Sequence, residues 1–516
     1  MGRVIALVIG HSGLPNEGTV VKLMRKPQGF IRRIRFLFNR LPRLGFGGDA
    51  METAISGRTP AAAILARLDR LPATRHVWLL VTLLSLGGMF EFYDLFMTAY
   101  VIPGLVKAGL LANVSVAIFT GPALFVAATF GGLFIGTFVF GYVADKYGRR
   151  TIFTYSMLWY SFATFVMALQ TTGLGVCLWR MIAGIGIGVE LVTIDTFIAE
   201  LVPKHLRGRA FAFNQMVEFA VVPVVALLAY LLVPASPLGV AGWRWVVAIG
   251  SLGALVVWFL RRGIPESPRW LINQGRLDEA ETVTAAIEAK VIGDLGGSVL
   301  PPAADHSVEK FEPVGSFAEI WEPTYRSRTV MLMVFQFFQT FGFYGFAAWV
   351  PTLIAQQAGI NLGASLLYSF IIAIANPFGP LLAMSFADKW ERKWQLVGAA
   401  CCIAVFGVLF SYQGTMPLLI TFGVLITLSN NVLSYSFHGY QTELFPTRVR
   451  ARAVGFTYSF SRISAVFASF IIAFVLQTAG TRGVFALIAF AMLMVVLSIG
   501  VWGPRTRELE LEQISH

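Results

Sequence analysis

Apolar stretches of roughly 20 residues, the length that crosses the hydrocarbon core of a membrane, recur along the chain from Val77 to Trp502. Lipid offers no hydrogen-bond partner to a free backbone group, so such stretches fold as helices, and the sequence lacks the alternating pattern of a membrane β-barrel. Of the 516 residues, 56% are hydrophobic and only 13% are charged, too few polar residues to cover a soluble domain of this size. The sequence therefore predicts an all-α membrane protein.

The spacing of these stretches predicts twelve transmembrane helices in two sets of six. The first set lies near 77–101, 119–143, 151–171, 174–198, 208–233 and 243–263. The second lies near 329–355, 363–386, 394–412, 415–440, 452–477 and 482–502.

The charges between these helices predict their orientation. Lys and Arg gather in every second gap, as Lys146 and Arg448 do, whereas the other gaps hold little more than Lys107 and Arg482. The positive-inside rule then places both termini in the cytoplasm, with the chain crossing the inner membrane many times. The net charge of +12 comes from these basic gaps and is explained by the membrane topology. We therefore expect the chain to contact a lipid bilayer and not a nucleic acid.

Polar segments divide the chain into five parts. Residues 1–50 are basic, and we expect them to be either an unstructured tail or an over-extended start of translation. The predicted parts are a basic cytoplasmic tail (1–70), an N-terminal six-helix half (71–263), a cytoplasmic linker (264–328), a C-terminal six-helix half (329–504) and a cytoplasmic tail (505–516).

The two halves repeat each other. Ala144–Arg150 (ADKYGRR) matches Ala387–Lys393 (ADKWERK), and Glu200–Ala210 matches Glu443–Ala453, both at an offset of 243 residues. Two matches at one offset are hard to obtain by chance. Parallel six-helix repeats around a central site are a transporter design.

Three further motifs carry a family resemblance. Gly141–Arg150 (GYVADKYGRR), Pro265–Leu271 (PESPRWL) and Arg180–Gly188 (RMIAGIGIG) resemble signatures of the major facilitator superfamily, most closely its sugar-porter and metabolite–proton symporter branches. The resemblance implies two pseudo-symmetric six-helix bundles and transport by alternating access. Where sugar porters carry Asn in the seventh helix and Trp in the tenth, this chain carries Tyr344 and His438, which favours an organic acid over a sugar.

Asp94 and Arg180 are the predicted proton-coupling pair. Each lies about seven residues, or roughly 10 Å, below the outer end of its helix, the first and the fourth. The resemblance implies that this pair couples protons to transport in proton-linked sugar porters. Glu91, one turn earlier on the same face, is a candidate to share the proton. A static salt bridge between two helices is the alternative.

Arg462 is the leading candidate to bind the substrate. It lies about ten residues inside the eleventh helix, and the C-terminal half offers no clear membrane acid to neutralise it. Its fork of donors fits a substrate carboxylate; an ion pair with an acid of the other half and a side chain reaching to the helix end are the alternatives. The other predicted substrate-binding residues are Gln215, Gln339, His438, Glu190, Glu218 and Tyr344.

Charges at the cytoplasmic ends of both halves predict a gate of salt bridges that break on switching. The residues are Asp145, Arg149, Arg150, Glu200, Arg207, Asp388, Arg392, Glu443 and Arg450. Asp195 and His438 hold equivalent places in the repeat and form a candidate inner gate, because His changes charge near neutral pH. Two independent polar residues facing a cavity are the alternative.

We expect no metal, cofactor or nucleotide. Cys177, Cys401 and Cys402 lie inside apolar segments without metal-ligand spacing, and the glycines from Gly184 to Gly188 follow no strand. The sequence shows no set of residues with the spacing of a catalytic site, so we predict a transporter and not an enzyme. We expect it to be a monomer. A proton-coupled symporter of a small organic acid is favoured; a sugar or polyol symporter and a proton-driven exporter remain alternatives.

Overall fold

The computed structural model describes residues 60–112, 114–116, 119–140, 146–253, 256, 263–302, 317–386, 390–445 and 447–506. The fold below is that of Ala61–His516, which form one compact unit. The predicted tail at 1–50 lies outside the described residues.

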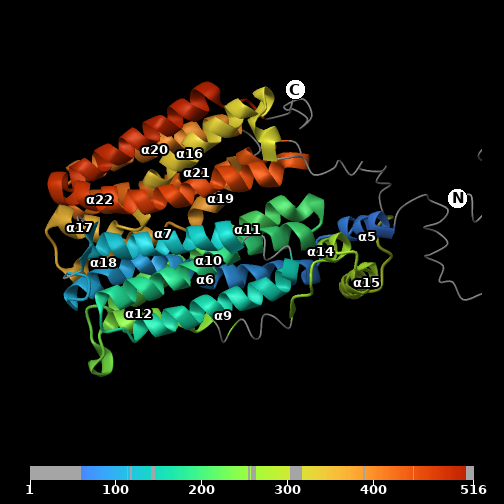
Figure 1. The fold of residues 1–516 in the computed structure, drawn as a ribbon, viewed down its shortest axis with the longest axis horizontal. Coiled ribbons are helices and arrows are strands. Elements are labelled where there is room, and N and C mark those ends of the chain that lie inside the picture. Colours follow the sequence, from blue (N-terminus) through green and yellow to red (C-terminus); the bar gives the residue numbers. More distant parts are fainter. Residues whose placement is uncertain are drawn as a thin grey trace, which may run out of the picture. The chain divides into compact units, whose positions relative to one another are not determined.

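The N-terminal half is built from six membrane helices (Figure 1): α6 (Arg75–Lys107), α7 (Gly121–Phe140), α9 (Arg149–Ala168), α10 (Gly173–Leu201), α11 (Arg207–Leu232) and α12 (Gly242–Ser251). A short antiparallel pair, β1 (Ser115–Val116) and β2 (Phe119–Thr120), precedes α7. Two 3₁₀ turns, η1 (Lys204–Leu206) and η2 (Pro237–Gly239), flank α11.

The C-terminal half contains α16 (Pro323–Ala347), α17 (Val350–Ala358), α18 (Leu362–Ala373), α19 (Phe378–Phe386), α20 (Arg392–Tyr412), α21 (Met416–Glu443) and α22 (Thr447–Leu497), with η3 (Phe317–Trp321) and η4 (Ser498–Trp502) at its ends. The predicted spans 329–355 and 363–386 are each broken into two helices. The second break falls before Phe378 at Pro377, which lacks the backbone N–H that a continuous helix requires.

Within the described residues, nine helices are long and apolar enough to cross a membrane. One of them, α22, holds two spans, because Gly480 breaks its helical geometry at φ 64° and ψ −165°. The remaining two spans are α9 and the segment that α12 begins, part of which falls outside the described residues. The predicted all-α, twelve-helix fold is confirmed.

The outer surface of the bundle is apolar, as a helix in lipid requires. On α9, Tyr155, Trp159 and Phe162 are each more than half exposed, and Arg149 at its beginning is buried. This inversion of the pattern of soluble proteins identifies the lipid-facing side of α9.

Glycines let α7 and α10 pack backbone to backbone. A Cβ on Gly132 would collide with the Met181 carbonyl oxygen, and one on Gly184 would lie 2.6 Å from the Thr129 carbonyl oxygen. The glycine run of α10 therefore serves close helix packing, which brings Arg180 of α10 beside Thr129 of α7.

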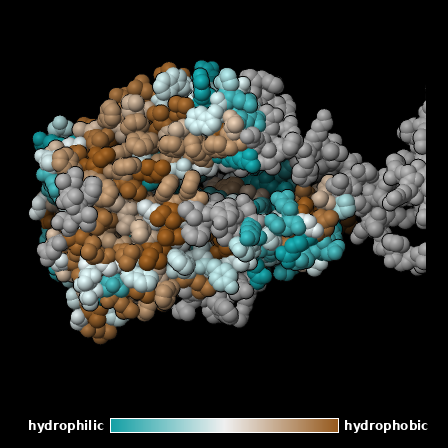
Figure 2. All heavy atoms as spheres, in the orientation of Figure 1, coloured by the Kyte–Doolittle hydropathy of each residue, from teal (hydrophilic) through white to brown (hydrophobic). Residues whose placement is uncertain are grey.

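The two halves meet along two helix pairs that are equivalent to each other in the repeat. In the N-terminal half, α7 packs against α22 and α11 packs against α18 of the other half. Figure 2 shows the space between the halves hollowed at one end, with hydrophilic residues around the opening. That end carries α5 (Pro60–Asp69), α14 (Pro268–Asn273) and α15 (Leu277–Asp294); we call it the linker end.

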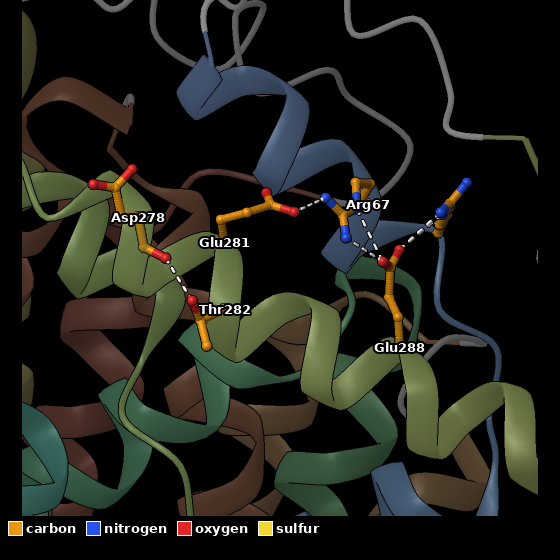
Figure 3. Close-up of polar contacts among 6 residues, drawn as sticks. Arg67, Asp278, Glu281, Thr282 and Glu288 are labelled. Atoms are coloured by element: carbon orange, nitrogen blue, oxygen red, sulfur yellow. Dashed lines mark hydrogen bonds and ion pairs between the residues drawn. The ribbon is translucent and has the colours of Figure 1, made fainter. Parts of the chain in front are cut away.

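Ion pairs fasten α5 to α15 at the linker end (Figure 3). Arg67 donates from Nε to Glu288 at 2.9 Å and also pairs with Glu281, and Arg70 donates to Glu288 at 2.8 Å. Burial of the Glu288 carboxyl opposes its ionisation, but hydrogen bonds from Arg67 and Arg70 outweigh burial and hold its pKa below the ordinary value. The carboxylate form therefore stabilises the docking of α15.

We expect this docking to persist above the ordinary carboxyl range of pH and to weaken as pH falls through the lowered pKa of Glu288. Glu288→Gln removes the charge at every pH and should speed proteolysis of the linker about tenfold, the effect of losing roughly 1.4 kcal/mol of local stability. Limited proteolysis of purified protein measures this. Glu279→Gln on the exposed face of α15 is the control, and equal rates for the two variants would contradict the role of Glu288.

Candidate functional site

Asp94 and Arg180 form a buried ion pair in the N-terminal half. Arg180 Nη1 donates to Asp94 Oδ2 at 2.9 Å, and Nη2 donates to the Asp94 carbonyl oxygen at 2.7 Å. Both side chains are at most 1% exposed. The structure therefore brings the predicted pair into direct contact between α6 and α10.

Three threonines from three helices complete this network. Thr98 and Thr129 accept from Arg180 at 2.8 Å and 2.9 Å, and Thr164 donates to Asp94 Oδ1 at 3.0 Å. Nearly every polar atom of the pair is thereby satisfied, as a charge buried in hydrocarbon requires. Sequence reasoning missed the threonines, because they are far apart in the chain and carry no motif.

Glu91, Glu190 and Glu218 form a second buried group, which we call the carboxyl cluster. Glu190 is fully buried and Glu91 is 1% exposed. Glu190 lies against Gly87 of α6, where an added Cβ would sit 3.6 Å from its Oε1, and Glu218 lies against Gly88 in the same way at 2.6 Å. Helices α10 and α11 thus bring two carboxyls to α6 within one turn of Glu91.

Arg462 lies in the C-terminal half and is 1% exposed. It donates from Nη1 to the Tyr344 hydroxyl at 3.0 Å and from Nη2 to the Tyr458 hydroxyl at 2.8 Å, and its guanidinium stacks on Tyr458 at 4.8 Å. Its buried Nε–H has no acceptor. Among the described residues, no carboxylate lies within ion-pair distance of Arg462.

His438 lies beside this cation. Its Nδ1 donates to the Ser434 carbonyl oxygen at 2.8 Å, and its ring centre is 6.0 Å from that of Tyr458. A carbonyl oxygen only accepts, so this bond assigns the proton of the neutral ring to Nδ1.

Asp195 is exposed although it belongs to the interior of the bundle. It interacts electrostatically with Glu218 of its own half and with Tyr458 of the other half. Solvent therefore reaches between the halves to the depth of Asp195 in this conformation. No contact joins Asp195 to His438 in the described part of the chain, so the proposed pairing of the two is not formed here.

Two small cavities lie between the two halves, on the side away from the linker end. One, of about 30 Å³, lies between the aromatic rings of Phe96 and Phe343 and the amides of Asn376, Asn430 and Asn431. The second, of about 10 Å³, is lined by Thr98, Thr129 and Tyr344. The first cavity has room for about two water molecules and the second for about one. Both are too small for a metabolite in this conformation.

The two predicted glutamines, Gln215 and Gln339, lie in different surroundings. Gln215 of α11 donates to Ser434 of α21 at 3.4 Å, across the interface. Gln339 donates to Gln336 at 3.2 Å, and Gln336 donates to Gln441 at 3.0 Å. Gln339 thus belongs to a buried amide chain within the C-terminal half.

Two ion pairs form among the predicted gate residues that the structure describes, one within each half. Arg149 donates to Glu200 at 3.0 Å, and Arg392 pairs with Glu443 at 2.7 Å. Arg207 donates to the Val202 carbonyl oxygen at 3.2 Å. Asp145, Asp388 and the side chain of Arg450 lie outside the described residues.

Glu266 joins this end of the N-terminal half and was missed as a gate residue. It accepts from the backbone N–H groups of Arg149 at 2.9 Å and Arg150 at 3.2 Å, so it caps the beginning of α9. Burial raises the pKa of Glu266 although these donors favour its charged form. Tyr458 was also missed, although its position four residues before Arg462 on one helix is a readable signal.

Two six-helix bundles with buried charges at their interface define a multi-pass membrane transporter of the major facilitator superfamily. Within it, residues 80–516 match the family described as Sugar (and other) transporter, and the chain belongs to this family.

The chain is 27% identical to the niacin transporter NiaP of Acinetobacter baylyi, over 87% of this chain and 99% of that protein. It is 28% identical to the inner membrane metabolite transport protein YgcS of Escherichia coli, over 86% of this chain and 95% of that protein. A structure of the xylose transporter XylE from E. coli, described as partially occluded and inward open, matches with a TM-score of 0.66 and 19% identity over 84% of this chain and 99% of that chain. This last likeness concerns the fold.

Removing one partner of the buried ion pair should destabilise the protein. Asp94→Ala leaves Arg180 charged and uncompensated, at a cost of about 3–5 kcal/mol. The double variant Asp94→Asn, Arg180→Gln removes both charges and should recover most of that loss. Thermal unfolding of purified protein tests this, and a double variant less stable than Asp94→Ala would contradict a direct pairing.

Proposed function

We propose that this chain is a symporter that carries a small organic acid inward together with a proton. The observation that carries the proposal is Arg462, a buried cation that donates only to tyrosine hydroxyls and retains an unused Nε–H. A buried charge with no opposite charge in direct contact is costly. A substrate carboxylate that reaches Arg462 supplies a charged partner in contact and the missing acceptors.

The Asp94–Arg180 pair is the proposed proton-coupling site, with Glu91 beside it. The ion pair joins α6 to α10 at 2.9 Å. A proton on Asp94 cancels its charge and loosens this contact, so protonation shifts the balance between two arrangements of the half. The small cavity between Thr98, Thr129 and Tyr344 offers a water-sized link between this pair and the substrate site.

The substrate is proposed to bind between Arg462 and the facing half. Tyr344 and Tyr458 hold the guanidinium fork in place, so it is pre-organised for a planar carboxylate. His438, Glu190 and Glu218 are the proposed polar residues around it, with Gln215 and Gln339 as further contacts. The relatives include proteins named niacin transporters, and nicotinate is an organic acid anion, which makes it a suitable first probe.

A proton-coupled sugar or polyol symporter is the second candidate. Structural neighbours include one described as the proton:xylose symporter XylE, and Gln215 and Gln339 are neutral amides of the kind that bind hydroxyl groups. Tyr344 and His438 stand where sugar porters carry Asn and Trp, which favours the acid.

We propose that the linker end faces the cytoplasm and that the chain works as a monomer in the inner membrane. The bundle then stands open to the inside, and the ion pairs of Arg149 with Glu200 and of Arg392 with Glu443 belong to the inner gate. Closing this end brings the two sets of charges together while the opposite end opens.

The test of symport is uptake by proteoliposomes under an imposed inward proton gradient. Labelled nicotinate and benzoate are compared with labelled xylose and a polyol. We expect an acid to accumulate and an uncoupler to abolish accumulation.

Asp94→Asn should abolish accumulation while leaving exchange of labelled for unlabelled acid, because the neutral residue mimics the protonated state. Accumulation by Asp94→Asn equal to the wild type would contradict the coupling role.

Arg462→Lys tests the substrate carboxylate. Lys keeps the charge but loses the bidentate fork, so uptake of an anionic acid should fall roughly a hundredfold, the equivalent of about 3 kcal/mol. Arg482→Lys is the control, beyond the break at Gly480, because Arg482 is exposed and stacks on Tyr412 at 4.9 Å. Equal losses for an acid and a neutral solute in Arg462→Lys would rule out the carboxylate role.

A further inference from the structure

The carboxyl cluster is unusual because three of its oxygen atoms are buried without a hydrogen-bond donor. Both oxygens of Glu190 and Oε1 of Glu91 have no partner. The nearby Ser156 hydroxyl donates to the Phe153 carbonyl oxygen at 3.2 Å. Glu218 receives one neutral hydrogen bond, from Asn214 at 2.7 Å.

The groups that face the cluster come from five helices. Glu91 interacts electrostatically with Glu190, Glu218 and Asp195 of its own half and with Arg462 across the interface. The hydroxyl of Tyr160 on α9 is buried without a partner and interacts with Glu190, Glu91 and Asp94. Of these facing groups, Arg462 is the one cation.

Three carboxylates cannot all be charged in this space. Each would be desolvated and repelled by the others, and the one neutral hydrogen bond, from Asn214 to Glu218, does not offset this cost. Arg180 is already engaged by Asp94 at 2.9 Å, which leaves Arg462 to compensate one negative charge. The same Arg462 is the proposed site of the substrate carboxylate, so a cluster carboxylate and the substrate compete for one cation.

We propose that the carboxyl cluster is a second proton-binding site, loaded when an organic anion binds to Arg462. Before the anion binds, Arg462 compensates an ionised Glu91 across the interface. When the anion binds, this compensation is withdrawn, and Glu91 takes a proton from water in the opening to become a neutral carboxyl group. Anion and proton therefore enter together, and the net charge of the site is unchanged.

Asp195 supplies the route for this proton. Its side chain is exposed in the opening at the linker end and interacts with both Glu218 and Glu91. A proton moves from water to Asp195 and then to the cluster, and returns the same way when the anion leaves. This inference rests on the proposed anion site, and it assigns to Glu91 a proton distinct from the one on Asp94.

Calorimetric titration of the purified full-length protein tests the proposal. Nicotinate and benzoate are the probes, each titrated in two buffers that differ in ionisation enthalpy, which gives the number of protons taken up per anion bound. The wild type and Asp94→Asn should each take up about one proton, with affinity falling about tenfold per pH unit on the alkaline side. Glu91→Gln should take up none and bind with an affinity that does not vary with pH.

Glu190→Gln changes the same buried cluster but keeps the Glu91 carboxyl, so it should keep proton uptake and controls for disturbed packing; Glu279→Gln on exposed α15 is the control outside the cluster. Anion binding without proton uptake by the wild type would overturn the second site and leave the anion site standing. Proton uptake that is kept in Glu91→Gln would also overturn it. No binding of either probe would contradict the anion site itself, and with it both proposals.

Discussion

The ion pair between Asp94 and Arg180 is the constraint on which the N-terminal half depends. A charge in the middle of a membrane bundle is tolerated only when its partner and its remaining hydrogen-bond atoms are fixed. Thr98, Thr129 and Thr164 meet this demand from three helices. The glycine contacts of α7 with α10 bring Thr129 close enough to do so, so the packing of the half and the chemistry of its charges are set together.

The two halves repeat in sequence but differ in the charges they present to each other. The N-terminal half carries the satisfied ion pair and an unsatisfied carboxyl cluster, and the C-terminal half carries Arg462 between two tyrosines. The negative interior of the N-terminal half faces the positive interior of the C-terminal half, and the two attract each other when no substrate is bound. A substrate that brings its own charge changes this balance, which gives a physical basis for coupling solute and proton.

The fold was readable from the sequence because lipid leaves a chain few options. Long apolar stretches must be helices, and the helices found lie within a few residues of the predicted spans at α10, α20 and α21. The breaks at Pro377 and between α16 and α17 were not predicted, since hydropathy alone does not register a lost backbone hydrogen bond. The contact between Asp94 and Arg180 was predictable from equal depth and opposite charge. Their threonine partners, the unpartnered oxygens of Glu190 and the position of Tyr160 were not, because these depend on how helices rotate against one another.

The most direct test of the central claim is proton movement driven by the solute alone. Proteoliposomes that contain a trapped pH-sensitive dye are given an inward gradient of nicotinate or benzoate without a pH gradient, and a gradient of xylose serves as the comparison. Symport with an acid predicts that the interior acidifies beyond the leak of the undissociated acid in protein-free liposomes, and that Asp94→Asn and Arg462→Lys remove this excess. Acidification with xylose and none with the acids would contradict the account and make a sugar the substrate.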